Sequence, residues 1–214
     1  MKLLFNGSES QDLLSSALED SPFRLMTEAD IPACLDLIQS AMDSTESLYA
    51  AATFRHHFDC HRKDIDDGRL LLLFEFGETP RGIVGLHHYV WGPTENVWLS
   101  WFAVHPALQH RGIGSQLFDQ VVVIAQELGF RKMLIETYSG PTFADARRFY
   151  SNRGFHQVGE TKDYLPDGSS MLVYARMLQG GGDGKTKRSA GLDFGADRPH
   201  CHPGDEASAG GFCQ

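Results

Sequence analysis

The fold of this chain is decided by the stretch VHPALQHRGIG, residues 104–114, which joins an apolar strand to an amphipathic helix. The run before it, residues 96–104, is apolar and rich in aromatic side chains, as expected of a strand. Gly112 and Gly114 lie at the junction and let the backbone approach a ligand closely. Because the first N–H groups of a helix have no partner within it, we expect an anion site here. Beyond the junction, apolar residues return at helical spacing, at Leu117, Phe118, Val121, Val122, Ala125 and Leu128.

The spacing of the glycines separates this loop from the common phosphate-binding motifs. A Walker loop needs Gly-Lys followed by Ser or Thr, and a dinucleotide fingerprint needs three glycines within a parallel βαβ unit. Residues 109–114, QHRGIG, have neither form and instead read Gln/Arg-x-x-Gly-x-Gly/Ala. In this hexapeptide the chain resembles the GNAT superfamily of acyl-CoA-dependent N-acyltransferases, whose pyrophosphate-binding motif has this form.

Two further segments carry the same resemblance. Residues 23–32 are similar to the opening of the superfamily, a short strand followed by Asp30 in position to cap a helix, with Pro32 in its first turn. Residues 146–155, which hold the pair Phe149-Tyr150, resemble the late helix and the glycine that ends it. The resemblance runs from about residue 22 to residue 178 and points to a bacterial-type branch.

The resemblance implies an α/β fold with a central mixed β-sheet and helices on both faces. It also implies that the strands at 96–104 and 131–137 splay apart at their C-terminal ends, so that the pantetheine arm of acyl-CoA fits between them. The residues themselves add that the apolar run 69–76 is a strand covered on both faces. The patterns predict strands at 23–27, 69–76, 82–90, 96–104, 131–137, 155–162 and 170–178, and helices at 30–41, 46–63, 112–128 and 143–152.

The composition predicts one domain with appendages. A chain of 214 residues that is 42% hydrophobic supports one core of about 150 residues. We expect an N-terminal extension at 1–21, whose residues 13–18 either pack on the domain or stay loose, and an acetyltransferase domain at 22–179. The tail at 180–214 is rich in Gly, Ala, Asp and Ser and is expected to be disordered, because it cannot bury enough apolar surface.

The net charge and the cysteine content limit the classes of partner and the cellular compartment that we expect. Nineteen Lys and Arg against 28 Asp and Glu give a net charge of −9, which disfavours nucleic acid and suits either simple solubility or the steering of a cationic amine. No segment approaches the roughly eighteen apolar residues of a membrane span, and the apolar start is too short for a signal peptide. The four cysteines form no Cys-x-x-Cys pair, which favours reduced thiols and a cytoplasmic protein, as a monomer or homodimer.

Acyl transfer from a thioester needs a donor for the oxyanion and a proton for the departing thiolate. By the resemblance, a backbone N–H near Val104 serves the carbonyl oxygen and Tyr150 protonates the sulfur. An ordinary pKa near 10 keeps a tyrosine phenol protonated at neutral pH. The resemblance also implies that acetyl-CoA binds to the strand end and loop through Phe102, Ala103, Val104, Gln109, His110, Arg111, Gly112, Ile113, Gly114 and Ser115.

The general base is where the chain departs from its relatives. Many of them carry an acid or histidine near the end of the central strand, whereas this chain has Trp98, Ser100 and Trp101 there. Three ionisable residues nearby remain as candidate bases, Glu95 at a hairpin and His87 and His88 on the neighbouring strand. Strand alternation sends the two histidines to opposite faces of the sheet. Proton transfer through water alone is the third route.

Clusters of metal-ligand residue types do not lead us to expect a metal. Residues 56–61, HHFDCH, fall in a helix that the resemblance places over the acceptor site, and adjacent histidines on a helix face different ways. His200, Cys201 and His202 are too few for a structural site, which needs about four ligands. Two other positions concern the cofactor: Phe143 replaces an Asn found in many relatives, and Arg147, like Arg111, is a candidate phosphate contact.

Two functions from different classes follow. The first is an acetyl-CoA-dependent N-acetyltransferase that acts on a primary amine of a small molecule or peptide by direct attack in a ternary complex. The second is a catalytically weak CoA-binding module with a regulatory or interaction role, which the missing base on the central strand would suit. The presence of Tyr150 favours the enzyme.

Overall fold

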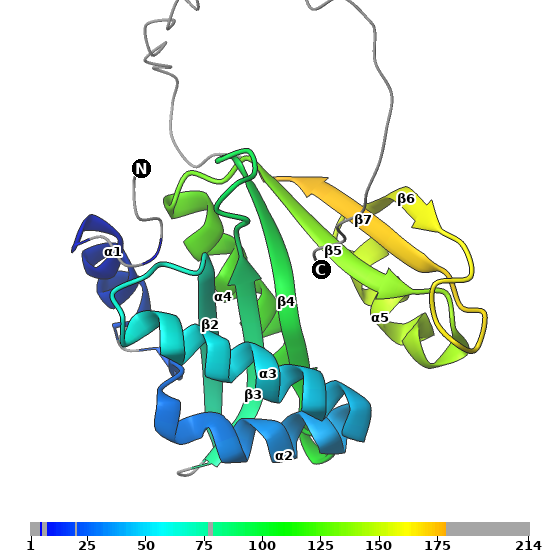
Figure 1. Cartoon of the computed structure of the whole chain (residues 1–214), viewed down its shortest axis with the longest axis horizontal. Coiled ribbons are helices and arrows are strands. Elements are labelled where there is room, and N and C mark those ends of the chain that lie inside the picture. Colours follow the sequence, from blue (N-terminus) through cyan, green and yellow to red (C-terminus); the bar gives the residue numbers. More distant parts are fainter. Residues whose placement is uncertain (1–4, 6–7, 20, 77–78, 179–214) are drawn as a thin grey trace, which may run out of the picture. The chain divides into compact units, whose positions relative to one another are not determined.

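The computed structural model describes residues 5, 8–19, 21–76 and 79–178 (Figure 1). These residues all belong to one of the chain's two units, Met1–Gly181. The second unit, Gly182–Gln214, and with it the tail expected to be disordered, lies outside the described residues. Within the described part, no helix combines the length and hydropathy needed to cross a membrane.

A seven-stranded mixed sheet forms the centre of the domain, in the order β1-β2-β3-β4-β5-β7-β6. Neighbouring strands run antiparallel except for β4 and β5, which pair in parallel. This confirms the predicted α/β architecture with one mixed sheet. The strands are β1 (Phe23–Leu25), β2 (Arg69–Phe76), β3 (Thr79–His87), β4 (Asn96–Val104), β5 (Lys132–Tyr138), β6 (His156–Thr161) and β7 (Met171–Met177).

Helices cover both faces of the sheet, as predicted (Figure 1). On one face α2 and α3 pack through Ile38 and Phe54, while on the other α4 packs through Leu117. The consecutive leucines of β2 divide between the two layers, since Leu70 and Leu72 join one cluster and Leu71 and Leu73 the other. The helices are α1 (Ser8–Leu18), α2 (Ile31–Ala41), α3 (Ser44–His61), α4 (Ile113–Glu127) and α5 (Ala144–Ser151), with 3-10 turns at Glu28–Asp30, Pro106–Leu108 and Pro141–Phe143.

The parallel strands β4 and β5 separate before they end. Their paired residues run from Asn96 opposite Lys132 to Leu99 opposite Ile135, and no pair follows in the described strands. The separation begins beside an irregularity in the pairing of β3 with β4, where Trp101 has a φ of 43°. A bulge of this kind bends a strand and increases its twist. The predicted splay of the two strands is therefore present, and Figure 1 shows them diverging.

Two local predictions were wrong in detail. The strand predicted at 82–90 spans Thr79–His87. It begins earlier than predicted because the register of β2 and β3 shifts after Phe74, so that Pro80 lies opposite Glu75. Proline is tolerated at this position although it donates no hydrogen bond. Asp30 precedes α2 but makes no side-chain cap of that helix. Its carboxylate instead accepts bonds from the Thr27 backbone at 2.7 Å and from Arg24, which also holds Glu75.

The N-terminal helix α1 packs on the domain, which decides between the two alternatives left open by the sequence. Leu14 is only 2% exposed and joins the cluster beneath α4. The side chain of Gln120 on α4 donates to the Ala17 carbonyl at 2.9 Å. Part of the expected extension is therefore continuous with the hydrophobic core.

Leu14→Ala is expected to lower the free energy of unfolding by about 2 to 5 kcal/mol, because it leaves a cavity in this cluster. Leu13, the neighbouring residue, is 40% exposed, so Leu13→Ala is the matched control and should change stability little. Chemical denaturation of both variants measures the difference. Equal midpoints for the two would show that α1 does not contribute to the core.

Candidate active site

The loop between β4 and α4 is held in shape by its own contacts. The Gln109 side chain donates to the Val104 carbonyl at 3.0 Å, which folds the loop back on the strand end. Gly112 precedes α4 with a φ of 85°, a left-handed conformation that favours glycine. Gly112 provides no side-chain cap for α4, and the first N–H groups of a helix have no partner within it. This is the geometry of an anion-binding helix start.

A cavity of about 500 Å³ lies against this loop. Its other wall is α5, through Asp145, Ala146, Phe149 and Tyr150. Seven of the ten residues predicted to bind the cofactor line it: Phe102, Val104, Gln109, His110, Gly112, Gly114 and Ser115. The other three lie elsewhere, since Ala103 and Ile113 are buried in the core and Arg111 is exposed and outside this lining.

A second cavity, of about 350 Å³, opens where β4 and β5 diverge. It shares Phe102, Ala146 and Tyr150 with the first, so the two cavities are adjacent at the splayed strands. Tyr150 is 7% exposed, and burial raises the pKa of its phenol above the ordinary value. The phenol therefore stays protonated at neutral pH at the point where the two cavities meet.

Ser100 supplies an unusual polar group in the second cavity. Among the described residues its Oγ is one of three buried side-chain N or O atoms without a hydrogen-bond partner. Buried polar atoms are nearly always paired, but this oxygen is closed to solvent and lies against Gly85, where an added Cβ would be 2.6 Å away. Ser100 lies on β4 where no ionisable side chain was found in the sequence.

The structure separates the three candidate bases. His87 lines the second cavity, and burial together with the charge of Arg69 lowers its pKa to about 4. His88 is 3% exposed, lies outside that lining, and has its Nδ1 3.0 Å from the Asn96 carbonyl oxygen. Glu95 is in the turn that precedes β4, at the opposite end of the strand from Val104, and lines neither cavity. Of the three candidates, only His87 lines either large cavity.

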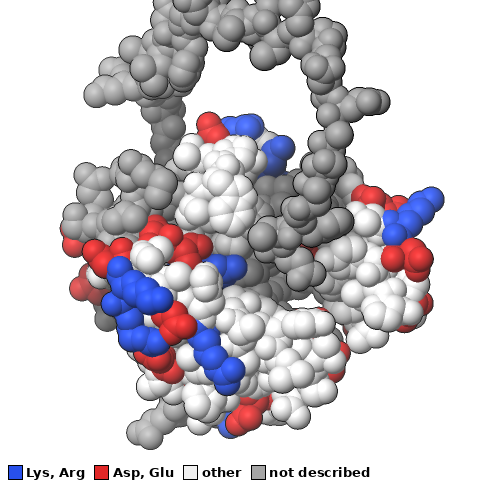
Figure 2. All heavy atoms as spheres, viewed as in Figure 1, with Lys and Arg blue, Asp and Glu red and all other residues white. Residues whose placement is uncertain are grey.

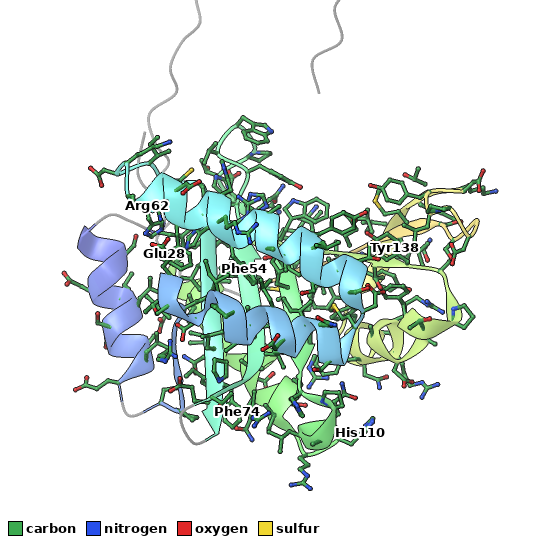
Figure 3. All side chains as sticks on the ribbon, turned by 60° about the horizontal axis from the view of Figure 1, so that its bottom comes forward. Glu28, Phe54, Arg62, Phe74, His110 and Tyr138 are labelled. Carbon is green, nitrogen blue, oxygen red and sulfur yellow. The ribbon has the colours of Figure 1, made fainter. Side chains whose placement is uncertain are left out.

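Sequence reasoning missed two carboxylates in this cavity, Glu46 in the first turn of α3 and Glu136 near the end of β5. Burial and the charges of Asp43 and Glu136 raise the pKa of Glu46. The Tyr138 hydroxyl donates to Glu136 at 2.9 Å, and Tyr138 lies beside the start of α3 in Figure 3. Burial and both carboxylates raise the pKa of that phenol as well. The sequence contains one signal for this position. Glu136 lies near the C-terminal end of β5, the strand that pairs in parallel with β4.

Two arginines near the cavities have structural partners. Arg147 donates to the carbonyl oxygens of Tyr138 and Gly140, at 2.5 and 2.8 Å, and so ties α5 to the end of β5. Arg153 donates to the Ser115 hydroxyl at 2.6 Å and lies over the Phe149 ring. This second contact joins the chain after α5 to the first turn of α4. Neither Arg147 nor Arg153 was predicted from the sequence to support the loop between β4 and α4.

Exposed apolar side chains lie beside the second cavity. Met42 is 43% exposed, and Leu48 and Tyr49 are 71% and 61% exposed. Uncharged residues cover this part of the surface over the end of α2 and the start of α3, whereas charged residues gather toward the end of α3 (Figure 2). Of these three residues Met42 lines the cavity, beside the carboxylate of Glu46.

Comparison with known proteins gives a family and a fold. The model of the acetyltransferase (GNAT) family matches residues 34–155. No curated protein matches the chain in sequence. Among solved structures, a GNAT-family protein from Desulfovibrio desulfuricans superposes with a TM-score of 0.66 at 22% identity, over 73% of this chain and 98% of that one.

Two further structures share the fold at lower identity. The ribosomal-protein-S18-alanine N-acetyltransferase of Escherichia coli has a TM-score of 0.58 at 17% identity, over 75% of this chain and 96% of its own. An aminoglycoside 6'-N-acetyltransferase in complex with coenzyme A has a TM-score of 0.58 at 11% identity, over 75% and 99%. At these identities the likeness concerns the fold.

Proposed function

The chain belongs to the acetyltransferase (GNAT) family, and from this premise we propose that it transfers an acetyl group from acetyl-CoA to a primary amine of a small molecule or peptide. One observation supports the proposal most. The cavity against the glycine loop and the cavity between the splayed strands meet at the buried phenol of Tyr150. Cofactor and acceptor can therefore approach from opposite sides and react directly in a ternary complex.

The cofactor half of the site follows from backbone chemistry. The pyrophosphate binds the N–H groups at the start of α4, where Gly112 and Gly114 leave room for it. The pantetheine arm then lies between β4 and β5, where both strands have backbone groups outside the parallel ladder, and bonds to them as an added strand would. Acetyl-CoA held in this way has its thioester near Tyr150.

The proposed reaction uses three groups. The neutral amine nitrogen attacks the thioester carbon, and a backbone N–H near Val104, close to the bulge in β4, donates to the oxyanion. The C–S bond breaks and the sulfur takes the proton of the Tyr150 hydroxyl. The amine loses a proton at the same stage, and the phenol regains one from solvent.

For the base we propose the carboxylates rather than a histidine. A pKa of about 4 makes His87 a weak base, and a carboxylate with a raised pKa, such as Glu46, accepts a proton closer to neutral pH. A water in the cavity carries the proton from the amine to these carboxylates. Glu136, which accepts a hydrogen bond from the Tyr138 hydroxyl, adds a second negative charge to the cavity.

The same field favours a cationic acceptor. Neither Lys nor Arg from the described residues lines the second cavity, whereas Glu46 and Glu136 do, beside the rings of Trp98 and Trp101. Aromatic faces and carboxylates both attract ammonium groups. We therefore propose an acceptor that carries a second positive charge next to the reacting amine, with apolar surface against Met42.

Glu46→Gln and Glu136→Gln each remove one negative charge and keep the shape of the side chain. Each is expected to lower kcat/KM for a cationic diamine by about tenfold, roughly 1.4 kcal/mol, and to leave acetyl-CoA affinity unchanged. Glu160→Gln on β6, an exposed position, is the matched control. Unchanged kcat/KM in both cavity variants would exclude a role for the carboxylates in acceptor binding or proton transfer.

A panel of primary amines with a free-thiol readout tests the activity itself. The enzyme releases CoA with at least one amine, well above the hydrolysis background. Tight uptake of acetyl-CoA without amine-dependent release of thiol would instead identify a CoA-binding regulatory or interaction module. The peptide and small-molecule arms of the panel then assign the acceptor class.

A further inference from the structure

Three metal-ligating side chains meet at the end of α3 that is distant from the proposed active site. His57 and His61 are four residues apart on the helix and so share one face. Asp67 comes from the connection that leads into β2. One ligand atom of each residue lies within 4.8 Å of the others. None of the three lines either of the two large cavities.

The cluster is built into the domain and open on one side. The side chains of His57 and Asp67 are 6% and 3% exposed, with Nδ1 and Oδ1 separated by 2.9 Å. The rings of His57 and His61 have centroids 4.4 Å apart. His61 is exposed, so an ion can enter from solvent on its side. Tetrahedral ligands at about 2.1 Å from an ion are roughly 3.4 Å apart, which requires small side-chain movements here.

Neighbouring groups orient the Asp67 carboxylate. Its Oδ1 lies 2.9 Å from His57 Nδ1 and accepts from the Arg69 backbone N–H at 3.2 Å. The Arg69 guanidinium holds the second carboxylate oxygen of Asp67 at 3.1 Å and so fixes its orientation. The cluster thus presents two imidazoles and one oriented carboxylate.

We propose that His57, His61 and Asp67 bind a divalent transition-metal ion of the zinc class, with water at the fourth position. Two imidazoles and one carboxylate suit such an ion better than calcium or magnesium, which prefer oxygen ligands. The neighbouring cavity is only about 80 Å³ and mostly apolar, which is too small for a substrate. The ion therefore has a structural or regulatory role. It ties the end of α3 to the start of β2.

Residues 56–61 by themselves do not predict this site. In the fold His57 and His61 share a face that excludes His56, whose Nε2 lies 3.6 Å from the Cys60 sulfur instead. Asp67 is beyond that segment, and a turn brings it back beside the helix. The third ligand is therefore a product of tertiary structure.

Calorimetry with Zn²⁺ on the full-length, chelator-treated protein tests the proposal, with thermal unfolding as a second readout. Wild type is expected to bind an ion at this site and to unfold at a higher temperature with zinc. His61→Ala, at an exposed position that leaves folding intact, is expected to weaken this binding at least tenfold and to lose the thermal shift. His56→Ala is the matched control and should keep both.

A second variant separates this site from the histidines near the C-terminus. His200→Ala combined with Cys201→Ser and His202→Ala is expected to keep the zinc-dependent thermal shift. The proposal is overturned if wild type binds no zinc, or if His61→Ala binds zinc as tightly as wild type. Loss of all binding in the triple variant, or in His56→Ala but not His61→Ala, would overturn it as well.

Discussion

Gly112→Asp is expected to weaken acetyl-CoA binding by more than a hundredfold. The new carboxylate would lie at the start of α4, where the pyrophosphate is proposed to bind the N–H groups. Two like charges about 5 Å apart repel by roughly 3 kcal/mol at the effective dielectric constant of a protein surface, which corresponds to about a 150-fold loss. The carboxylate also competes for the same backbone donors, as acidic residues at helix starts do.

Gly129 provides a closely matched control for this variant. Gly112 and Gly129 lie at opposite ends of α4 with φ values of 85° and 84°, and an added Cβ would meet no atom within 4 Å at either. Gly129→Asp therefore introduces the same backbone strain and charge, away from the loop. Calorimetric titration of both folded variants with acetyl-CoA is the measurement. Equal affinities would show that this loop does not bind the pyrophosphate.

Tyr150→Phe is expected to lower kcat by about a hundredfold, the usual contribution of general acid catalysis. The ring keeps its contacts with Phe149 and Phe155, so folding and acetyl-CoA affinity should persist. A loss in kcat without a change in cofactor binding indicates an interaction made in the transition state. Single-turnover measurements with the best acceptor of the panel isolate the chemical step.

Tyr174 is the matched control for the phenol. It is buried to a similar degree, 9% exposed, but lies on β7 and lines neither large cavity. Tyr174→Phe should turn over at close to the wild-type rate. If Tyr150→Phe also did so while chemistry limits the rate, the thiolate would take its proton from water or another residue, and Tyr150 would serve only as a wall of the cavity.

The elements that the sequence predicted are those set by local patterns. The glycine loop and α4 follow from residues adjacent in the chain, and the leucine run of β2 requires layers on both faces wherever it lies in the sheet. The divergence of β4 and β5 came from the family resemblance, since hydrophobic spacing carries no information on where two strands stop pairing. Its physical basis is the bulge at Trp101.

The missed features depend on segments distant in sequence. In the sequence Glu46 is an acid at a helix start and Glu136 an acid at a strand end, and only the tertiary fold brings both to one cavity. Asp67 joins His57 in the same way. Strand alternation correctly predicted that His87 and His88 lie on opposite faces of the sheet. It could not predict the burial of His87 or its proximity to Arg69, which together lower the pKa of His87. Ionisation depends on three-dimensional surroundings.

A crystal structure of the protein with acetyl-CoA tests the central claim most directly. The account predicts the pyrophosphate on the backbone of Gly112 to Ser115, the pantetheine arm between β4 and β5, and the thioester sulfur within hydrogen-bonding distance of the Tyr150 hydroxyl. Acetyl-CoA bound elsewhere, or bound with its sulfur far from Tyr150, would contradict it.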